Sequence, residues 1–141
     1  MIDWGYRSDG IPVQLFGAWT TLPAGPATLA AKTGSRILPI AIRWTKGGGF
    51  DVSWAAPIDV PPGDPAALQR ATQAMADALA VTIRTAPEQW YSFKPIWPAG
   101  AAEAADLERR AKVMLAGRPD PGPRRGLPRD EADGAAGGGQ A

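Results

Sequence analysis

The sequence of 141 residues predicts an α/β fold, and three observations indicate it. Apolar residues alternate over residues 11–16, which is the period-two pattern of a half-buried strand. An apolar run at 37–43 and an alternating segment at 50–54 flank three glycines, as in a β-hairpin. Residues 64–86 carry a helical apolar stripe behind an Asp-Pro start.

The first predicted strand, residues 11–16, contains Pro12, which favours the start or the edge of a sheet. We expect residues 17–24 to form a loop. A Gly-Pro pair at 25–26 then opens a short helix, because proline suits the first helical turn. Gly34 suits the left-handed residue that ends such a helix.

Residues 37–43 predict the second strand, and their nearly continuous apolar run is typical of a strand covered on both faces. A right-handed crossover through the short helix would place this strand parallel to the first. Pro39 argues against a central position, because proline cannot donate a hydrogen bond to a neighbouring strand. The glycines at 47–49 turn the chain into residues 50–54.

The long helix is the clearest element. Asp64 can cap its first turn, Pro65 suits the first helical position, and Pro87 ends it. At a rise of 1.5 Å per residue, about 22 residues give a helix roughly 33 Å long. Apolar side chains recur along one side at steps of three or four, namely Leu68, Thr72, Met75, Leu79 and Ile83.

Composition divides the chain into three parts. All 11 aromatic residues lie within residues 1–98, which we interpret as the part able to build a core. Residues 99–116 are rich in alanine and predict another helix. Residues 117–141 contain 7 glycines and 4 prolines, and we expect them to be disordered.

Charge gives no indication of nucleic-acid binding, which requires a concentrated basic surface. The chain carries 15 Lys and Arg against 14 Asp and Glu, a net charge of +1. We interpret the arginine pairs at 109–110 and 124–125 as solvated charges, since acidic neighbours balance them. No segment approaches the ~18 continuous apolar residues of a membrane-spanning helix.

The chain contains neither cysteine nor histidine. The lack of cysteine excludes disulfides, thiolate metal sites and a cysteine nucleophile. The lack of histidine removes the commonest general base at neutral pH and the commonest metal ligand.

Several motifs in order resemble the bacterial glycolipid acyltransferases, which include the late acyltransferases of lipid A synthesis and the phosphatidylinositol mannoside acyltransferases. They are DWGYRSDGIPVQLFG at 3–17, LPAGPATLA at 22–30, TGSRILP at 33–39, PEQWY at 87–91 and KPIW at 94–97. The stretch FKPIW at 93–97 is more similar to the mannoside enzymes. The resemblance covers residues 3–98.

This resemblance implies the C-terminal part of a glycerolipid acyltransferase-like sheet with flanking helices. It implies transfer of a fatty acyl group from acyl-CoA or acyl carrier protein to a hydroxyl of a membrane glycolipid or lysophospholipid. It implies no metal and no cofactor, and a bacterial protein in the cytoplasm with peripheral contact at the inner face of the cell membrane.

The family's base is a histidine paired with an acidic residue five positions later, upstream of every motif matched here. We therefore expect this chain to be a fragment, inactive alone, whose incomplete core leaves it marginally stable. The alternatives are a non-catalytic binding domain that pairs with a separate catalytic half, and a gene fragment with no function of its own.

None of the candidate site residues is catalytic. Arg7 offers a fork of donors for a phosphate, and the helix start at Gly25 offers backbone N–H groups. A strand of six residues would separate Arg7 from Thr20 by roughly 20 Å at about 3.3 Å per residue. The alternatives are an ordinary ion pair, cap or helix opening. The predicted substrate-binding residues are Asp3, Arg7, Trp19, Thr20, Thr21 and Gly25.

Trp90 and Trp97 have a different expected role. Because tryptophan carries a large apolar surface, we expect both rings to pack the end of the long helix onto the sheet.

Overall fold

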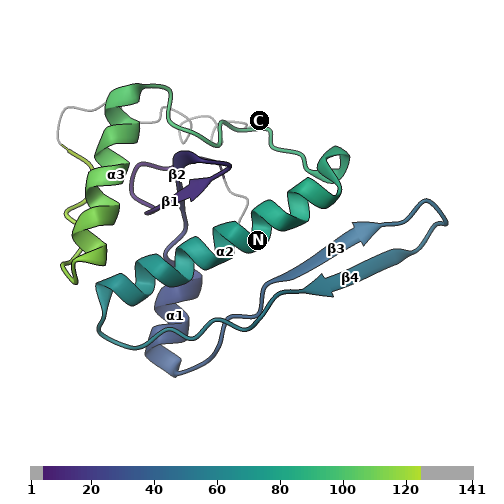
Figure 1. Ribbon diagram of the computed structural model, residues 1–141, viewed down its shortest axis with the longest axis horizontal. Coiled ribbons are helices and arrows are strands. Elements are labelled where there is room, and N and C mark those ends of the chain that lie inside the picture. The colour runs from purple at the N-terminus through teal and green to yellow at the C-terminus, as the bar shows by residue number, and fades with distance from the viewer. Residues whose placement is uncertain (1–4, 125–141) are drawn as a thin grey trace, which may run out of the picture.

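A computed structural model describes residues 5–124 (Figure 1). The predicted mixture of helices and strands is confirmed, but the strands form two separate two-stranded sheets. In chain order the elements are β1 (Ile11–Leu15), β2 (Ala18–Leu22), α1 (Gly25–Thr33), β3 (Ile40–Trp44), β4 (Phe50–Trp54), α2 (Pro65–Thr85), the 3₁₀ helix η1 (Pro87–Gln89) and α3 (Ala101–Leu115).

The predicted loop at 17–24 is wrong, because most of it is β2, which pairs antiparallel with β1. Phe16 and Gly17 connect the two strands with φ values of 54° and 82°. Two positive φ values are the geometry of a tight hairpin turn, which usually carries Asn-Gly or Asp-Gly. The pair Phe-Gly lacks that signature, and the hairpin therefore escapes prediction.

The predicted parallel crossover is also wrong, because β3 pairs with β4 and not with β1. Side chains of α2 occupy the free edge of β1 instead. The Gln73 amide accepts a hydrogen bond from the Gln14 N–H at 2.8 Å and donates one to the Gln14 carbonyl at 2.9 Å. Gln69 donates to the Pro12 carbonyl at 3.3 Å. These amides take the place of a neighbouring strand.

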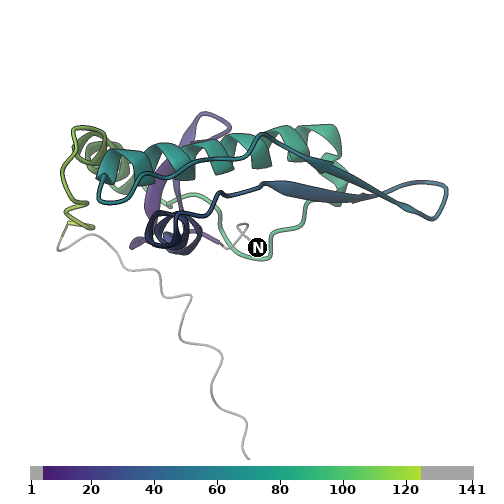
Figure 2. The same cartoon turned by 90° about the horizontal axis from the view of Figure 1, so that it is seen from below.

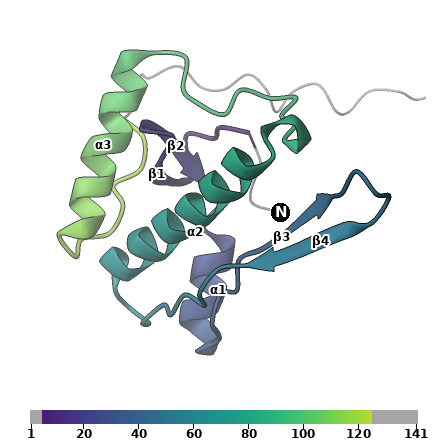
Figure 3. The same ribbon diagram turned by 45° about the vertical axis from the view of Figure 1, so that its right-hand side comes forward.

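Helix α2 is the centre of the fold and lies against β1, α1 and α3 (Figure 1; Figure 3). Its start is as predicted, since the Asp64 carboxylate accepts a hydrogen bond from the Ala66 N–H at 2.8 Å. Thr72, Met75 and Ile83 of the predicted stripe are buried. The long helix therefore provides the surface on which the other elements assemble.

Helix α3 confirms the predicted helix within 99–116, but the interpretation of Arg110 as a solvated charge is wrong. Its side chain is only 1% exposed and forms an ion pair with Asp120. Arg109 and Arg124 both pair with the buried Asp106. Arg125 and the rest of the predicted disordered tail, residues 125–141, lie outside the described residues.

The β3–β4 hairpin contradicts the prediction of a strand covered on both faces. It extends beside α2 and away from the other elements (Figure 2). Every residue of β4 is exposed, and β3 alternates between exposed and half-buried residues. Because β1 does not pair with β3, nothing in residues 5–124 covers the strand as a central strand would be covered.

Candidate functional site

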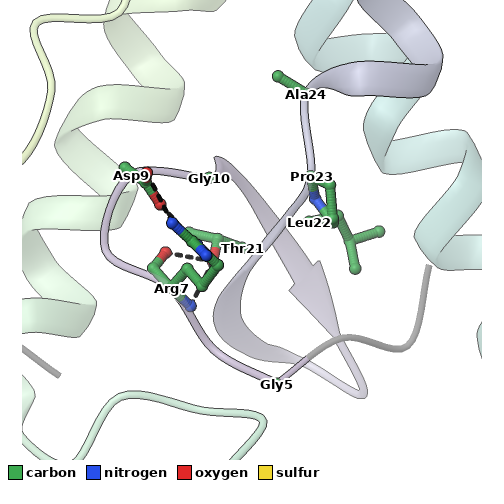
Figure 4. A pocket seen from close by; sticks show the side chains of 8 residues that line it. All are labelled: Gly5, Arg7, Asp9, Gly10, Thr21, Leu22, Pro23 and Ala24. Carbon is green, nitrogen blue, oxygen red and sulfur yellow. Dashed lines mark hydrogen bonds and ion pairs between the residues drawn. The ribbon is translucent and has the colours of Figure 1, made fainter. Parts of the chain in front are cut away.

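A pocket of about 320 Å³ lies where the segment before β1 meets the end of β2 (Figure 4). The β1–β2 hairpin brings these two segments together, although they are more than ten residues apart in sequence. The pocket also reaches the segment that leads into α1. Its lining residues are Gly5, Arg7, Asp9, Gly10, Thr21, Leu22, Pro23 and Ala24.

Arg7 and Asp9 provide the charged groups of the pocket. The Arg7 Nε donates to Asp9 Oδ1 at 3.1 Å, and Nη2 donates to Oδ2 at 3.3 Å. The hydrogen bond from Arg7 holds the pKa of the Asp9 carboxyl below its ordinary value of 3.8. The Arg7 side chain is 47% exposed. The guanidinium is therefore oriented by a carboxylate but still reaches solvent.

Thr21 fixes the backbone of Arg7. Its hydroxyl donates to the Arg7 carbonyl at 2.6 Å and accepts from the Arg7 N–H at 3.2 Å. The expected separation of Arg7 from the residues that follow the first strand is therefore wrong, because β2 folds back along β1. Arg7 and Thr21 become neighbours in one pocket.

Thr20 points to the opposite side of β2, since neighbouring side chains alternate along a strand. It is 1% exposed and its hydroxyl donates to the Ile96 carbonyl. Trp19 is half-buried on the same strand, outside the pocket lining. Gly25 is exposed as the first residue of α1. Asp3 lies outside the described residues. The structure thus gathers only Arg7 and Thr21 in the pocket, with Gly25 directly after its edge.

Arg110 supports this pocket from behind, and sequence reasoning missed it. Its Nη1 donates to the Ser8 carbonyl at 2.6 Å and its Nη2 to the Gly10 carbonyl at 2.7 Å. A helical spacing was the available signal, because Arg110 follows Leu107 by three residues and precedes Met114 by four, and both are buried. An arginine within such a stripe indicates a buried partner.

Gly10 allows the backbone before β1 to approach β2. A Cβ at this position would lie 2.7 Å from the Thr21 Cβ and 2.9 Å from the Leu22 carbonyl oxygen. Contacts this short do not occur in unstrained packing, so this wall of the pocket requires a glycine at position 10.

The predicted tryptophans pack near the β1–β2 hairpin. The Trp97 indole N–H donates to the Leu15 carbonyl at 3.4 Å. The Trp90 ring lies 6.2 Å from the ring of Phe16, in the hairpin turn. The Arg84 guanidinium of α2 lies over the Phe16 ring, 5.2 Å from its centroid. The segment after α2 is thereby attached to the sheet.

The pocket has the groups to bind an anion but lacks an evident base. Asp9 is the carboxylate in its lining, and its lowered pKa makes it a weak base. Among residues 5–124 no three Asp, Glu, His or Cys side chains cluster as a metal site would require. Within the same residues, no helix combines the length and apolarity needed to cross a membrane.

Comparison with known proteins finds similarity over most of the described chain. The sequence model of the bacterial lipid A biosynthesis acyltransferases matches residues 2–98. The phosphatidylinositol mannoside acyltransferase of Mycolicibacterium smegmatis is 38% identical over 105 residues, which cover 74% of this chain and 32% of that protein. Proteins of the same description from Mycobacterium tuberculosis strains CDC 1551 and H37Rv are each 36% identical over 103 residues, covering 73% of this chain and 31% of theirs. The chain spans about a third of the length of these curated relatives.

Proposed function

The chain belongs to the bacterial lipid A biosynthesis acyltransferase family, and on this premise we propose that it forms the acceptor-binding part of a fatty acyltransferase. The acceptor is a membrane glycolipid or lysophospholipid with a phosphate in its headgroup. The donor is a carrier thioester, either acyl-CoA or acyl carrier protein. The acyl group leaves the thioester sulfur and forms an ester with an acceptor hydroxyl.

The observation that carries this proposal is the position of the Arg7 guanidinium in the pocket of the family-matched segment. The Nε and Nη2 donors of Arg7 face Asp9, so in this proposal the phosphate oxygens meet the Nη1 side of the guanidinium, which presents further N–H donors in the same rigid plane. Thr21 holds the Arg7 backbone on both sides, and Asp9 orients the side chain. The start of α1 at Gly25 adds backbone N–H groups at the edge of the same pocket.

The proton of the acceptor hydroxyl must pass to a base as the oxygen attacks the thioester carbonyl. The chain has no histidine, and Asp9 is tied to Arg7 with a lowered pKa. We therefore place the base on polypeptide outside these 141 residues. In this proposal residues 5–25 bind and orient the acceptor, and the chain alone does not transfer acyl groups.

The proposed acceptor is also the basis for a proposed location. A glycolipid or lysophospholipid keeps its acyl chains in a membrane while its headgroup is modified. We place the assembled enzyme in the cytoplasm, in peripheral contact with the inner face of the cell membrane.

The test uses a chimera in which this chain replaces the matched region of the M. smegmatis relative. Arg7→Ala should lower kcat/KM for the phosphate-bearing acceptor by about 10- to 100-fold, because a hydrogen bond to a charged group contributes about 1.5–3 kcal/mol. Arg36→Ala is the matched control, since Arg36 forms an exposed bidentate pair with Asp59 outside the pocket lining. Equal activity of both variants would exclude Arg7 from acceptor binding.

The second candidate is a non-catalytic binding domain, which the absence of histidine favours. Such a domain would bind the acceptor and present it to a separate catalytic partner. The isolated chain would then bind vesicles containing the anionic glycolipid through Arg7. A chimera without transfer activity, combined with Arg7-dependent vesicle binding, would favour this candidate.

A further inference from the structure

One face of the β3–β4 hairpin consists entirely of large apolar side chains. Directly opposed residues of an antiparallel pair share a face, and the pairs are Ile40–Trp54, Ile42–Val52 and Trp44–Phe50. Each of these side chains is between 50% and 76% exposed. We call this surface the apolar hairpin face: Ile40, Ile42, Trp44, Phe50, Val52 and Trp54.

The other face of the hairpin is small and polar. Arg43 and Asp51 oppose each other there and form an ion pair, and Ala41 opposes Ser53. Both strands therefore show the alternation of a sheet with one buried face. Within residues 5–124, however, the face that this pattern marks for burial is the exposed one.

The edges of the hairpin also have unused hydrogen-bonding groups. The Thr45 N–H donates to the Gly49 carbonyl, and the Ala55 N–H donates to the Pro39 carbonyl. Because hydrogen-bonded pairs alternate along antiparallel strands, the odd-numbered residues of β3 are the ones that bond to β4. In this register the backbone groups of Phe50, Val52 and Trp54 point away from β3. Nothing within residues 5–124 is hydrogen-bonded to them. The open edge of β4 thus borders the apolar hairpin face along its full length.

On the opposite edge of the hairpin, one residue of β3 has a side-chain partner for its backbone. The Gln89 side chain accepts from the Trp44 N–H at 2.8 Å and donates to the Trp44 carbonyl at 2.9 Å. This repeats the arrangement by which Gln73 closes the edge of β1 at Gln14. Gln89 thus covers the β3 edge at Trp44 alone. The outward backbone groups of Ile40 and Ile42 on that edge, and those of all three even-numbered residues of β4, have no such partner among the described residues.

We propose that the apolar hairpin face and the β4 edge form the docking surface for further polypeptide of an acyltransferase domain. A strand of that polypeptide pairs with Phe50, Val52 and Trp54, and its apolar side chains cover the hairpin face. The inference rests on the proposed function in one respect, namely that the catalytic base lies outside this chain.

The unpaired edge favours a polypeptide over a lipid bilayer as the occupant. A strand supplies both the donors and the acceptors that the β4 backbone lacks, as in other cases of strand addition. Hydrocarbon supplies neither, and an unpaired backbone group in a bilayer costs several kcal/mol. The length comparison agrees, since the relatives contain about twice as much further polypeptide as the part matched here.

The test is co-expression of the full chain with the part of the M. smegmatis relative that it does not match. We expect a complex that co-purifies, in which the Val52 amide exchanges hydrogen more slowly than in the chain alone. Val52→Lys places a charge on the face, and Val52→Pro removes the outward N–H without breaking a bond to β3. Each should weaken the complex at least tenfold, whereas the matched control Val81→Lys, at an exposed apolar position on α2, should not.

Other outcomes overturn the proposal. One is binding to phosphatidylglycerol vesicles that Val52→Lys abolishes while no polypeptide complex forms, since a bilayer would then be the occupant. Another is a homodimer that Val52→Lys dissociates, because a second copy would then cover the face. The absence of any complex, with an unprotected Val52 amide, also excludes docking. Arg7→Ala should leave the complex intact. Because the chimera joins both parts in one chain, its activity does not depend on the association of two separate chains. The proposed function and the docking proposal can therefore fail independently.

Discussion

Thr20 and Thr21 are neighbours on β2 but act on different parts of the molecule. Thr21 faces the pocket and holds Arg7, whereas Thr20 faces the interior and holds the carbonyl of Ile96. The strand alternation that separates them is visible only once residues 18–22 are known to be a strand. Treated as members of one loop, both are expected to meet the substrate.

Thr20→Val should destabilise the fold. The substitution keeps the side-chain shape but leaves the Ile96 carbonyl without its donor, at a cost of about 1–3 kcal/mol in the free energy of unfolding. Urea denaturation measures the change. Thr33→Val is the control, because the Thr33 hydroxyl bonds to Leu29 on an exposed part of α1 and should cost far less. Equal effects would contradict the structural role of Thr20.

Gly10→Ala should also destabilise the fold and disturb the pocket. The new Cβ would meet the Thr21 side chain and the Leu22 carbonyl oxygen, and such overpacking costs about 1–3 kcal/mol. Gly25→Ala is the control, since open space surrounds a Cβ there. Thermal unfolding of both variants checks the prediction. A Gly10→Ala protein as stable as the wild type would mean that the two strands separate easily.

At the scale of elements, the helices are predictable and the strand pairing is not. The ends of α2 follow from Asp64, Pro65 and Pro87, which act on the local backbone. The partner of a strand depends on contacts distant in sequence, and here the decisive ones are glutamine amides on the edge of β1. No local pattern in residues 11–43 predicts these hydrogen bonds from the glutamines of α2.

The candidate site shows the same division. Arg7 could be predicted from its motif and from the chemistry of the guanidinium group. Its contact with Thr21 could not, because it depends on the turn at Phe16 and Gly17. Arg110 was missed since a charged side chain in a helix is solvated unless the surrounding fold supplies partners. The carbonyls of Ser8 and Gly10, about a hundred residues earlier, are such partners.

The attachment of α3 to the pocket predicts a large effect at Arg110. Arg110→Met keeps much of the volume but removes the hydrogen bonds to the Ser8 and Gly10 carbonyls and the charge partner of Asp120. Removing one partner of a buried ion pair costs about 3–5 kcal/mol, and we expect the lower end of this range because the Asp120 side chain is 23% exposed. Lys112→Met is the control, because the Lys112–Glu108 pair is exposed and should contribute little. Urea denaturation of both variants measures the difference, and similar midpoints would contradict the structural role of Arg110.

At the scale of the whole molecule, the described core is one-sided. Helix α2 is covered by α1, α3 and the β1–β2 hairpin, whereas the β3–β4 hairpin offers its apolar face to solvent. The expectation that the isolated chain is marginally stable therefore remains a prediction. In a chain of marginal stability, the loss of one ion pair changes the midpoint of unfolding measurably.

The Arg110–Asp120 pair makes the free energy of unfolding decrease at acid pH. Burial of the Asp120 carboxyl opposes its ionisation, but the hydrogen bonds from Arg110 and from the Gly122 N–H outweigh burial and hold the pKa below 3.8. Near and below pH 4 the unfolded chain therefore binds more protons than the folded chain at this group, and the free energy of unfolding rises with pH. The contribution of Asp120 is complete above the unfolded pKa and disappears as pH falls through the folded one.

Asp120→Asn should lower the free energy of unfolding at pH 7 and reduce its decline between pH 5 and pH 2, because the amide cannot ionise. Asp59→Asn is the matched control, since it removes an exposed ion pair with Arg36 and should alter stability less at pH 7. Thermal unfolding across this pH range separates the two variants. If Asp120→Asn retains the full acid decline of the wild type, then other carboxylates cause it, and the link from α3 through Arg110 to the pocket contributes nothing to acid unfolding.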